Sequence, residues 1–128
     1  MNDYCDIRKP QIIVTNNPMV AKEYERNYKV DYLGEDTYLL EVMLKAADYI
    51  RAGHRLITHP LAGSLKPNEI KYKSILISGG NINAERDVSR SMELINSCML
   101  KVTDFPVIDI PEEHWKELQL IDYILVTQ

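Results

Sequence analysis

Short apolar runs punctuate the chain at intervals and predict a set of strands. Those at 11–15, 28–34, 54–58 and 72–78 are bounded by turn-forming residues such as Pro, Gly and Asn, which is typical of strands. A last run over 120–127 is strongly apolar and predicts a final strand covered on both faces. The pattern therefore indicates about five strands.

Between these runs, apolar residues recur at helical spacing. The segments at about 36–52 and 83–102 are predicted to be long helices that pack against one sheet. In the second, the apolar positions span only about 80° of the helix circumference, and Cys98 lies at the margin of this stripe. The stripes comprise Leu39, Met43, Ala46, Ala47 and Ile50 in the first helix, and Val88, Met92, Ile95, Met99 and Val102 in the second.

Capping residues set the expected ends of the helices. Asp36 or Thr37 is expected to cap the first long helix, and Gly53 to end it. Asn83 is the expected cap of the second. Pro111 suits the first position of a short helix through "EEHWKEL", and "MVAKEYERN" after the first strand predicts another.

The alternation of strands and helices predicts an α/β fold. We expect a small three-layer arrangement with a mostly parallel sheet of about five strands and flanking helices, in one domain over 1–128 with a flexible tail at 1–10. The connection 58–72 shows no helical pattern. An alternative is therefore that the strands at 54–58 and 72–78 are antiparallel neighbours.

Composition narrows the classes of function. The 128 residues carry a net charge of −4, which argues against general nucleic-acid binding and against adsorption to an anionic membrane. No apolar run approaches the roughly 18 residues that span a bilayer, and the N-terminus has no signal-peptide core, so a cytoplasmic location is expected. Cys5 and Cys98 lack C-x-x-C spacing, and Cys98 is interpreted as a packing residue.

Polar segments follow three predicted strands, at 15–18, 58–69 and 78–81. If the strands are parallel, these segments share one edge of the sheet, where ligands of α/β proteins bind. Amides, hydroxyls, a lysine and glycines that expose backbone N–H groups suit a small anionic metabolite. The candidate ligand-binding residues are Asn16, Asn17, His59, Ser64, Lys66, Ser78, Gly79 and Gly80.

Each segment also has a structural interpretation as an ordinary turn, and known motifs are missing: there is neither a Walker A loop nor G-x-G-x-x-G. His59 with Ser64 and Lys66 is the sharpest enzymatic hypothesis, although no G-x-S-x-G surrounds Ser64. His54 and His59 lie about 16 Å apart along an extended strand, too far to share a metal ion, so no metal site is predicted. The residues identify no cofactor.

The stretches "IVTNNPMV", "GHRLITHPLAGSLKPNE" and "YKSILIS" resemble, in this order and spacing, the GrdX proteins encoded beside glycine, sarcosine and betaine reductases. The resemblance covers roughly residues 11–126. It implies an accessory role in amino-acid reduction, with a reductase subunit as partner, and it supplies no catalytic residues. Three functions are therefore kept: a binder of a small anion, a small hydrolase or transferase, and a docking scaffold. The apolar terminal run adds a homodimer as an alternative.

Overall fold

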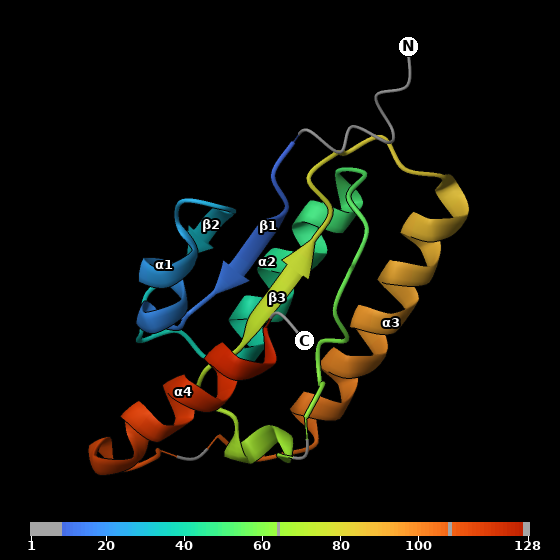
Figure 1. The fold of residues 1–128 in the computed structure, drawn as a ribbon. Helices are drawn as coiled ribbons and strands as arrows, with labels where there is room; N and C mark the ends of the chain where they lie inside the picture. The colour runs from blue at the N-terminus through green and yellow to red at the C-terminus, as the bar shows by residue number, and fades with distance from the viewer. Residues whose placement is uncertain (1–8, 64, 108, 127–128) are drawn as a thin grey trace.

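The computed structural model of the protein describes residues 9–63, 65–107 and 109–126. Most of the expected N-terminal tail, Cys5 included, therefore lies outside the described residues. The elements follow in the order β1 (Ile12–Thr15), α1 (Pro18–Tyr24), β2 (Lys29–Tyr32), α2 (Leu39–Arg51), the 3-10 turn η2 (Pro67–Glu69), β3 (Ser74–Ile77), α3 (Glu85–Thr103), the 3-10 turn η3 (Glu112–His114) and α4 (Trp115–Leu125) (Figure 1).

The sheet differs from the expected one in size and direction. Within the described residues it has three strands in the order β2-β1-β3. β1 is parallel to β2, with Ile12 opposite Lys29, but antiparallel to β3, with Ile12 opposite Ile77 and Thr15 opposite Ser74. The prediction of a mostly parallel sheet of about five strands is therefore wrong.

The segment 54–58 does not form a full strand, and it runs antiparallel to β3. Leu56 makes one bridge with Ile77, and the N–H of Ile57 donates to the carbonyl of Leu76 at 2.9 Å. The antiparallel alternative for these two segments is thus confirmed. Antiparallel neighbours can be joined by a loop, whereas parallel ones need a long crossover that is usually helical, and the connection here contains only η2.

Helices pack on both faces of the sheet because its strand side chains alternate in direction. Ile12 and Val14 of β1 join Ile75 and Ile77 of β3 in the cluster that α2 covers. Ile13 and Leu76 point to the other face and pack with Val20 of α1 and with Val126, which directly follows α4. Both faces of β1 and β3 are therefore buried, which accounts for their largely apolar sequences.

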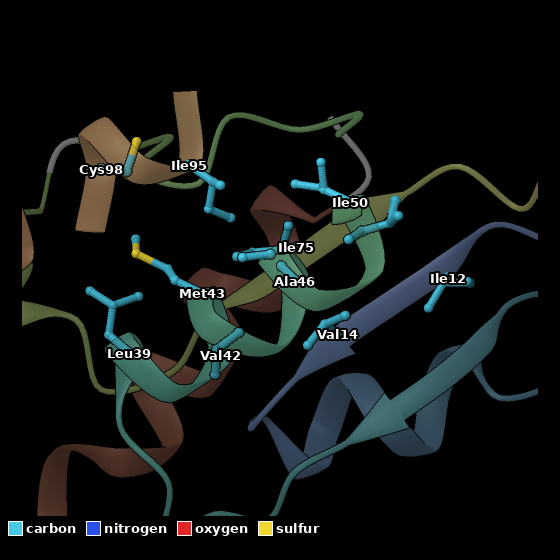
Figure 2. Close-up of a cluster of buried hydrophobic side chains, with 12 residues drawn as sticks. Ile12, Val14, Leu39, Val42, Met43, Ala46, Ile50, Ile75, Ile95 and Cys98 are labelled. Carbon is cyan, nitrogen blue, oxygen red and sulfur yellow. The ribbon is translucent and has the colours of Figure 1, made fainter. Parts of the chain in front are cut away.

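The two long predicted helices are present, but only α2 covers the sheet directly. α3 packs mainly on α2, and Figure 2 shows Ile95 and Cys98 of α3 beside Met43 of α2. Leu56 donates its N–H to the Oγ of Ser91 at 2.9 Å, so the segment after α2 separates α3 from β3 (Figure 1). Cys98 is 2% exposed and belongs to the centre of the packed face rather than to its margin.

The expected caps are shifted by one or two residues. Tyr38 is the N-cap residue of α2, and its N–H donates to the Glu41 carboxylate at 3.1 Å. Ala84, not Asn83, is the N-cap residue of α3. Asn83 instead donates to the carbonyl of Gly53 at 2.7 Å, which ties the end of α2 to the start of α3. Gly53, with φ +108°, follows the C-cap of α2 as predicted.

The expected final strand over 120–127 is wrong, because the chain is helical from Trp115 to Leu125; Thr127 lies outside the described residues. A short apolar run does not distinguish a strand from a buried helix by itself. The side chains of Gln119 and Asp122, three residues apart, face the interior together. Across the described residues, no helix combines the length and apolar character needed to cross a membrane.

Candidate functional site

The three predicted site segments lie at two ends of the sheet. Because β3 is antiparallel to β1, Ser78, Gly79 and Gly80 lie beside the start of β1, whereas Asn16 and Asn17 follow its end. A Cβ at Gly79 would lie 2.4 Å from the carbonyl oxygen of Pro10, so the glycine permits close backbone packing there. The single edge expected for all eight candidate residues is therefore not formed.

The Ser78–Gly80 segment is held by its own contacts. The Oγ of Ser78 accepts the N–H of Arg55 at 2.9 Å and donates to the carbonyl of Gly80 at 3.0 Å. The carbonyl of Ser78 is 2.8 Å from the Nδ1 of His54, a buried ring that stacks edge-on against Tyr49. These bonds join β3 to the segment that follows α2. Ligand binding by this segment stays a prediction.

Asn16 is fully buried, and both the nitrogen and the oxygen of its side-chain amide are hydrogen-bonded within the protein. Its Nδ2 donates to the carbonyls of Thr37 at 2.8 Å and Lys71 at 2.9 Å, and its Oδ1 accepts the N–H of Lys73 at 2.9 Å. Three segments far apart in sequence are thereby joined at the end of β1. The structure therefore gives Asn16 an architectural role at the site rather than a group that faces a ligand.

Asn17 has a similar role one residue later. Its Oδ1 accepts the N–H of Met19 at 3.0 Å and caps α1, while its Nδ2 donates to the carbonyl of Gln119 and to the Oδ2 of Asp122. Asp122 also accepts the N–H and the hydroxyl of Ser74, at 2.9 and 2.7 Å. This buried carboxylate thus fixes α4 against both α1 and β3.

Two loop residues of the enzymatic hypothesis, His59 and Lys66, are on the surface. His59 is exposed, and its Nδ1 accepts the N–H of Leu61 at 3.0 Å, which closes a local turn. Lys66 is also exposed, and its N–H donates to the Glu69 carboxylate at 2.8 Å as η2 begins. Ser64 lies outside the described residues, so the pairing of His59 with Ser64 stays a prediction.

A cavity of about 380 Å³ lies between this loop and α4. Its polar groups come from the segment that leads into β3 and from Asp122, and its apolar wall comes largely from α4. Small-molecule sites typically combine such an apolar lining with a few polar groups. The lining residues are Ala62, Gly63, Leu65, Ile70, Lys71, Tyr72, Lys73, Leu118, Ile121, Asp122 and Leu125.

Lys73 is the most unusual residue of this cavity. It is charged in solution yet only 5% exposed, as is Asp122, but Asp122 accepts hydrogen bonds from both Asn17 and Ser74, whereas Lys73 makes a single hydrogen bond through its side chain among the described residues. Its Nζ donates to the carbonyl of Ala62 at 3.1 Å, and both residues line the cavity. Burial lowers the pKa of Lys73, and the nearby charge of Asp122 offsets part of this effect. Among the described residues, Lys73 makes no ion pair.

The wall beside Lys73 is held by a second polar cluster. The hydroxyl of Tyr72 donates to the Glu35 carboxylate, and the Nε2 of Gln119 donates to that carboxylate and to the Tyr72 hydroxyl, each at 3.1 Å. Burial and the hydrogen bond to Glu35 raise the pKa of Tyr72. The Nζ of Lys71 lies over the rings of Tyr72 and Trp115, 5.2 and 4.3 Å from their centroids.

Comparison with known proteins identifies the family. The model of the GrdX-like protein family matches residues 12–128. The chain belongs to this family. The match runs from β1 to the end of the chain and confirms the resemblance carried by the loop and its flanking strands. No curated protein and no solved structure matches the chain.

For this GrdX-like protein, sequence reasoning missed Lys73 and Asp122. Each is the single charged residue of an otherwise uncharged run, "YKSILIS" or "LIDYILV". A charged residue at such a position is often on a solvated face, so the pattern alone does not separate an exposed side chain from a buried one. The available signal was their position: each interrupts a run whose other members are expected to be buried.

Proposed function

We propose that this GrdX-like protein is an accessory protein of glycine, sarcosine or betaine reduction that binds a small anionic metabolite in the cavity beside α4. Membership of the family supports the association with amino-acid reduction. The cavity and its buried lysine support the class of ligand. In this proposal Lys73 takes the role that the sequence assigned to Lys66.

The observation that carries the proposal is the environment of the Lys73 ammonium group. An ammonium group has three N–H donors, and within residues 9–63, 65–107 and 109–126 one carbonyl, that of Ala62, accepts from Nζ. A buried charge is costly unless it is paired and hydrogen-bonded. A carboxylate or phosphate oxygen in the cavity would supply both the missing acceptor and the opposite charge.

The remaining walls define what kind of anion fits. Leu118, Ile121 and Leu125 present an apolar face on the α4 side, while Lys71 adds a second cation near the cavity. Asn16 and Asn17 hold the walls in place through buried hydrogen bonds and do not contact the ligand in this proposal. The best fit is a small acid with a compact apolar body.

The binding test uses Lys73→Met, which keeps the length of the side chain and removes its charge. Small carboxylates and inorganic phosphate are screened by thermal shift, and hits are titrated by calorimetry. A charge-assisted hydrogen bond contributes roughly 1.5–3 kcal/mol, so Lys73→Met should weaken binding by about ten- to hundredfold. The exposed Lys66→Met is the matched control and should bind as the wild type does; equal affinities for all three proteins would contradict the proposal.

The accessory role is tested separately. The rate of glycine, sarcosine or betaine reduction by the purified reductase is measured with and without the protein. We expect the protein to change this rate, and we expect Lys73→Met to reduce the effect. If the rate is unchanged at all protein concentrations while the cavity still binds an acid, the link to reduction is wrong and the binding site remains.

A further inference from the structure

Resting on the proposed binding site, we infer that Lys73 forms an imine with the carbonyl carbon of a small 2-oxo acid held in the cavity beside α4. The inference goes beyond binding because it gives the lysine a covalent role and specifies a carbonyl group next to the anionic group. Three features of the structure carry it: the burial of the amine, the hydrogen bond that positions its nitrogen, and the occupied carboxylate nearby.

The amine is buried without a counter-ion in the described part of the chain. Asp122 is the carboxylate whose charge influences the pKa of Lys73. It already accepts hydrogen bonds from Asn17 and from the N–H and hydroxyl of Ser74. On the α3 side, the titratable group near enough to influence the pKa of Lys73 is the buried thiol of Cys98. A lysine desolvated in this way has more of its neutral, nucleophilic form than an exposed lysine at the same pH.

One hydrogen bond positions the nitrogen. Its acceptor is the carbonyl of Ala62, 3.1 Å away, and Ala62 lines the same cavity as Lys73. A neutral amine that donates one N–H to this carbonyl keeps its lone pair for attack on a carbonyl carbon. The cavity volume of about 380 Å³ is sufficient for a small acid beside the amine.

The reaction balances without an oxidant or a reductant. The lone pair of Nζ forms the C–N bond, the carbonyl π bond breaks, and one proton passes from Nζ to the carbonyl oxygen to give a neutral carbinolamine. Uptake of one proton from solvent then lets the hydroxyl group leave as water, which breaks the C–O bond and leaves a protonated C=N bond. This product is a cation in an apolar site, and the carboxylate of a 2-oxo acid, directly next to the new bond, supplies its counter-charge. A neutral ketone would leave the cation unpaired.

The experiment is reductive trapping of the full chain. Wild-type protein is incubated with pyruvate and sodium cyanoborohydride, and the modified position is mapped by peptide mass spectrometry. We expect the adduct at Lys73 to form several-fold faster than the adduct at the exposed Lys66. The ratio of these two rates should increase as the pH is lowered below the range in which exposed lysines lose their protons. Lys73→Arg should lose this adduct, and Lys66→Arg should retain it.

Calorimetry with pyruvate and with lactate, which has the carboxylate but no carbonyl, separates this inference from the binding proposal. Binding of both acids that depends on Lys73, with no trapped adduct at Lys73, would overturn the imine and leave the binding site standing. No binding of any acid and no adduct would overturn both. Adducts distributed equally over exposed lysines and Lys73 would also overturn the inference of an imine at Lys73. This outcome is measured on the wild-type protein, so it does not depend on whether Lys73→Arg folds.

Discussion

Individual buried polar side chains connect the segments around the cavity. Asn16 joins the backbones of Thr37, Lys71 and Lys73, while Asn17 and Asp122 join α1, β3 and α4. Because every one of these groups has partners inside the protein, the network fixes the walls of the cavity without requiring a ligand. Lys73 is the exception, since its ammonium group is buried with one acceptor among the residues that the structure describes.

At the residue scale, we predict that Lys73→Met stabilises the protein at neutral pH. The folded state lowers the pKa of Lys73 below the ordinary 10.5, chiefly by burial. Between the lowered pKa and 10.5 the unfolded chain binds more protons, so the wild-type free energy of unfolding rises with pH through this window. The cost of the buried charge is fully present below the window and is relieved above it.

The free energy of unfolding of Lys73→Met should therefore exceed that of the wild type by on the order of 1 kcal/mol or more at about pH 7, and this difference should shrink toward about pH 10. Urea unfolding of both proteins at the two pH values measures it. The exposed Lys66→Met should show no such pH-dependent difference. A variant that is less stable than the wild type at neutral pH would show that the Lys73 ammonium group stabilises the fold.

A second prediction at this scale concerns Asn17→Ala. The change removes the cap of α1 and leaves the carbonyl of Gln119 and one oxygen of Asp122 with fewer donors. We expect a loss of about 2–4 kcal/mol in the free energy of unfolding. Asn27→Ala, at an exposed position after α1, is the control and should cost little. Similar small losses in the two variants would contradict the buried network.

At the scale of elements, the ends of α2 and β3 are packed against each other by backbone contacts. Gly53 follows the end of α2 and has a positive φ. The side-chain Nδ2 of Asn83 donates to the carbonyl of Gly53 at 2.7 Å and to the carbonyl of Gly80 at 2.9 Å. The carbonyl of Asn81 approaches Gly53 so closely that an added Cβ would lie 2.1 Å from its oxygen. This contact fixes where α3 begins relative to α2.

We therefore predict that Gly53→Ala is markedly more destabilising than Gly34→Ala. Both glycines have a positive φ, +108° and +98°, but a Cβ at Gly34 would meet nothing within 4 Å. Gly34→Ala should cost about 1–2 kcal/mol for the backbone alone, and Gly53→Ala should add the cost of moving the Asn81 backbone. Thermal or urea unfolding compares the two variants. Equal losses in the free energy of unfolding would show that the 81–83 segment moves away from an added Cβ at no cost.

At the scale of the whole molecule, α4 shows a second apolar face to the solvent. Leu120, Ile121 and Ile124 are 47, 40 and 49% exposed, and Ile121 also lines the cavity. The opposite side of the helix holds the buried Gln119 and Asp122. Clustered apolar exposure of this kind is typical of an interaction surface. The homodimer suggested by the apolar C-terminal run therefore stays a prediction, with the exposed face of a helix rather than a strand as its interface.

We predict that the chain self-associates through this face of α4 at micromolar concentration. The double change Leu120→Lys and Ile124→Lys should shift the species seen by sedimentation velocity to the 14.8 kDa monomer. Leu44→Lys, on the exposed side of α2 at 47% exposure, is the matched control and should leave the association unchanged. A wild-type protein that already sediments as a monomer would rule out the homodimer.

The sequence determined the elements whose signals are local. The strands at Ile12–Thr15, Lys29–Tyr32 and Ser74–Ile77 and the helix α2 lie within the predicted segments, and α3 extends one residue beyond its segment. The spacing of apolar residues over one short window decides which face of an element is buried. The end of α2 beside Gly53 was predictable from the glycine itself, because a residue with positive φ commonly follows a helix C-cap. The family was also recognisable from contiguous residues, and its model covers residues 12–128.

Tertiary structure alone decided the direction of β3, the helical state of the last apolar run and the identity of the buried lysine. Strand direction depends on which neighbour satisfies the backbone groups of β1, and no local pattern encodes that choice. The run containing Asp122 becomes a helix whose carboxylate meets Ser74, 48 residues earlier in the chain. Lys73 is buried and donates to the carbonyl of Ala62, 11 residues earlier in the chain, whereas Lys66, which lies between them in sequence, remains in solvent. The burial of a charge is set by packing between segments, which the local pattern of residues does not contain.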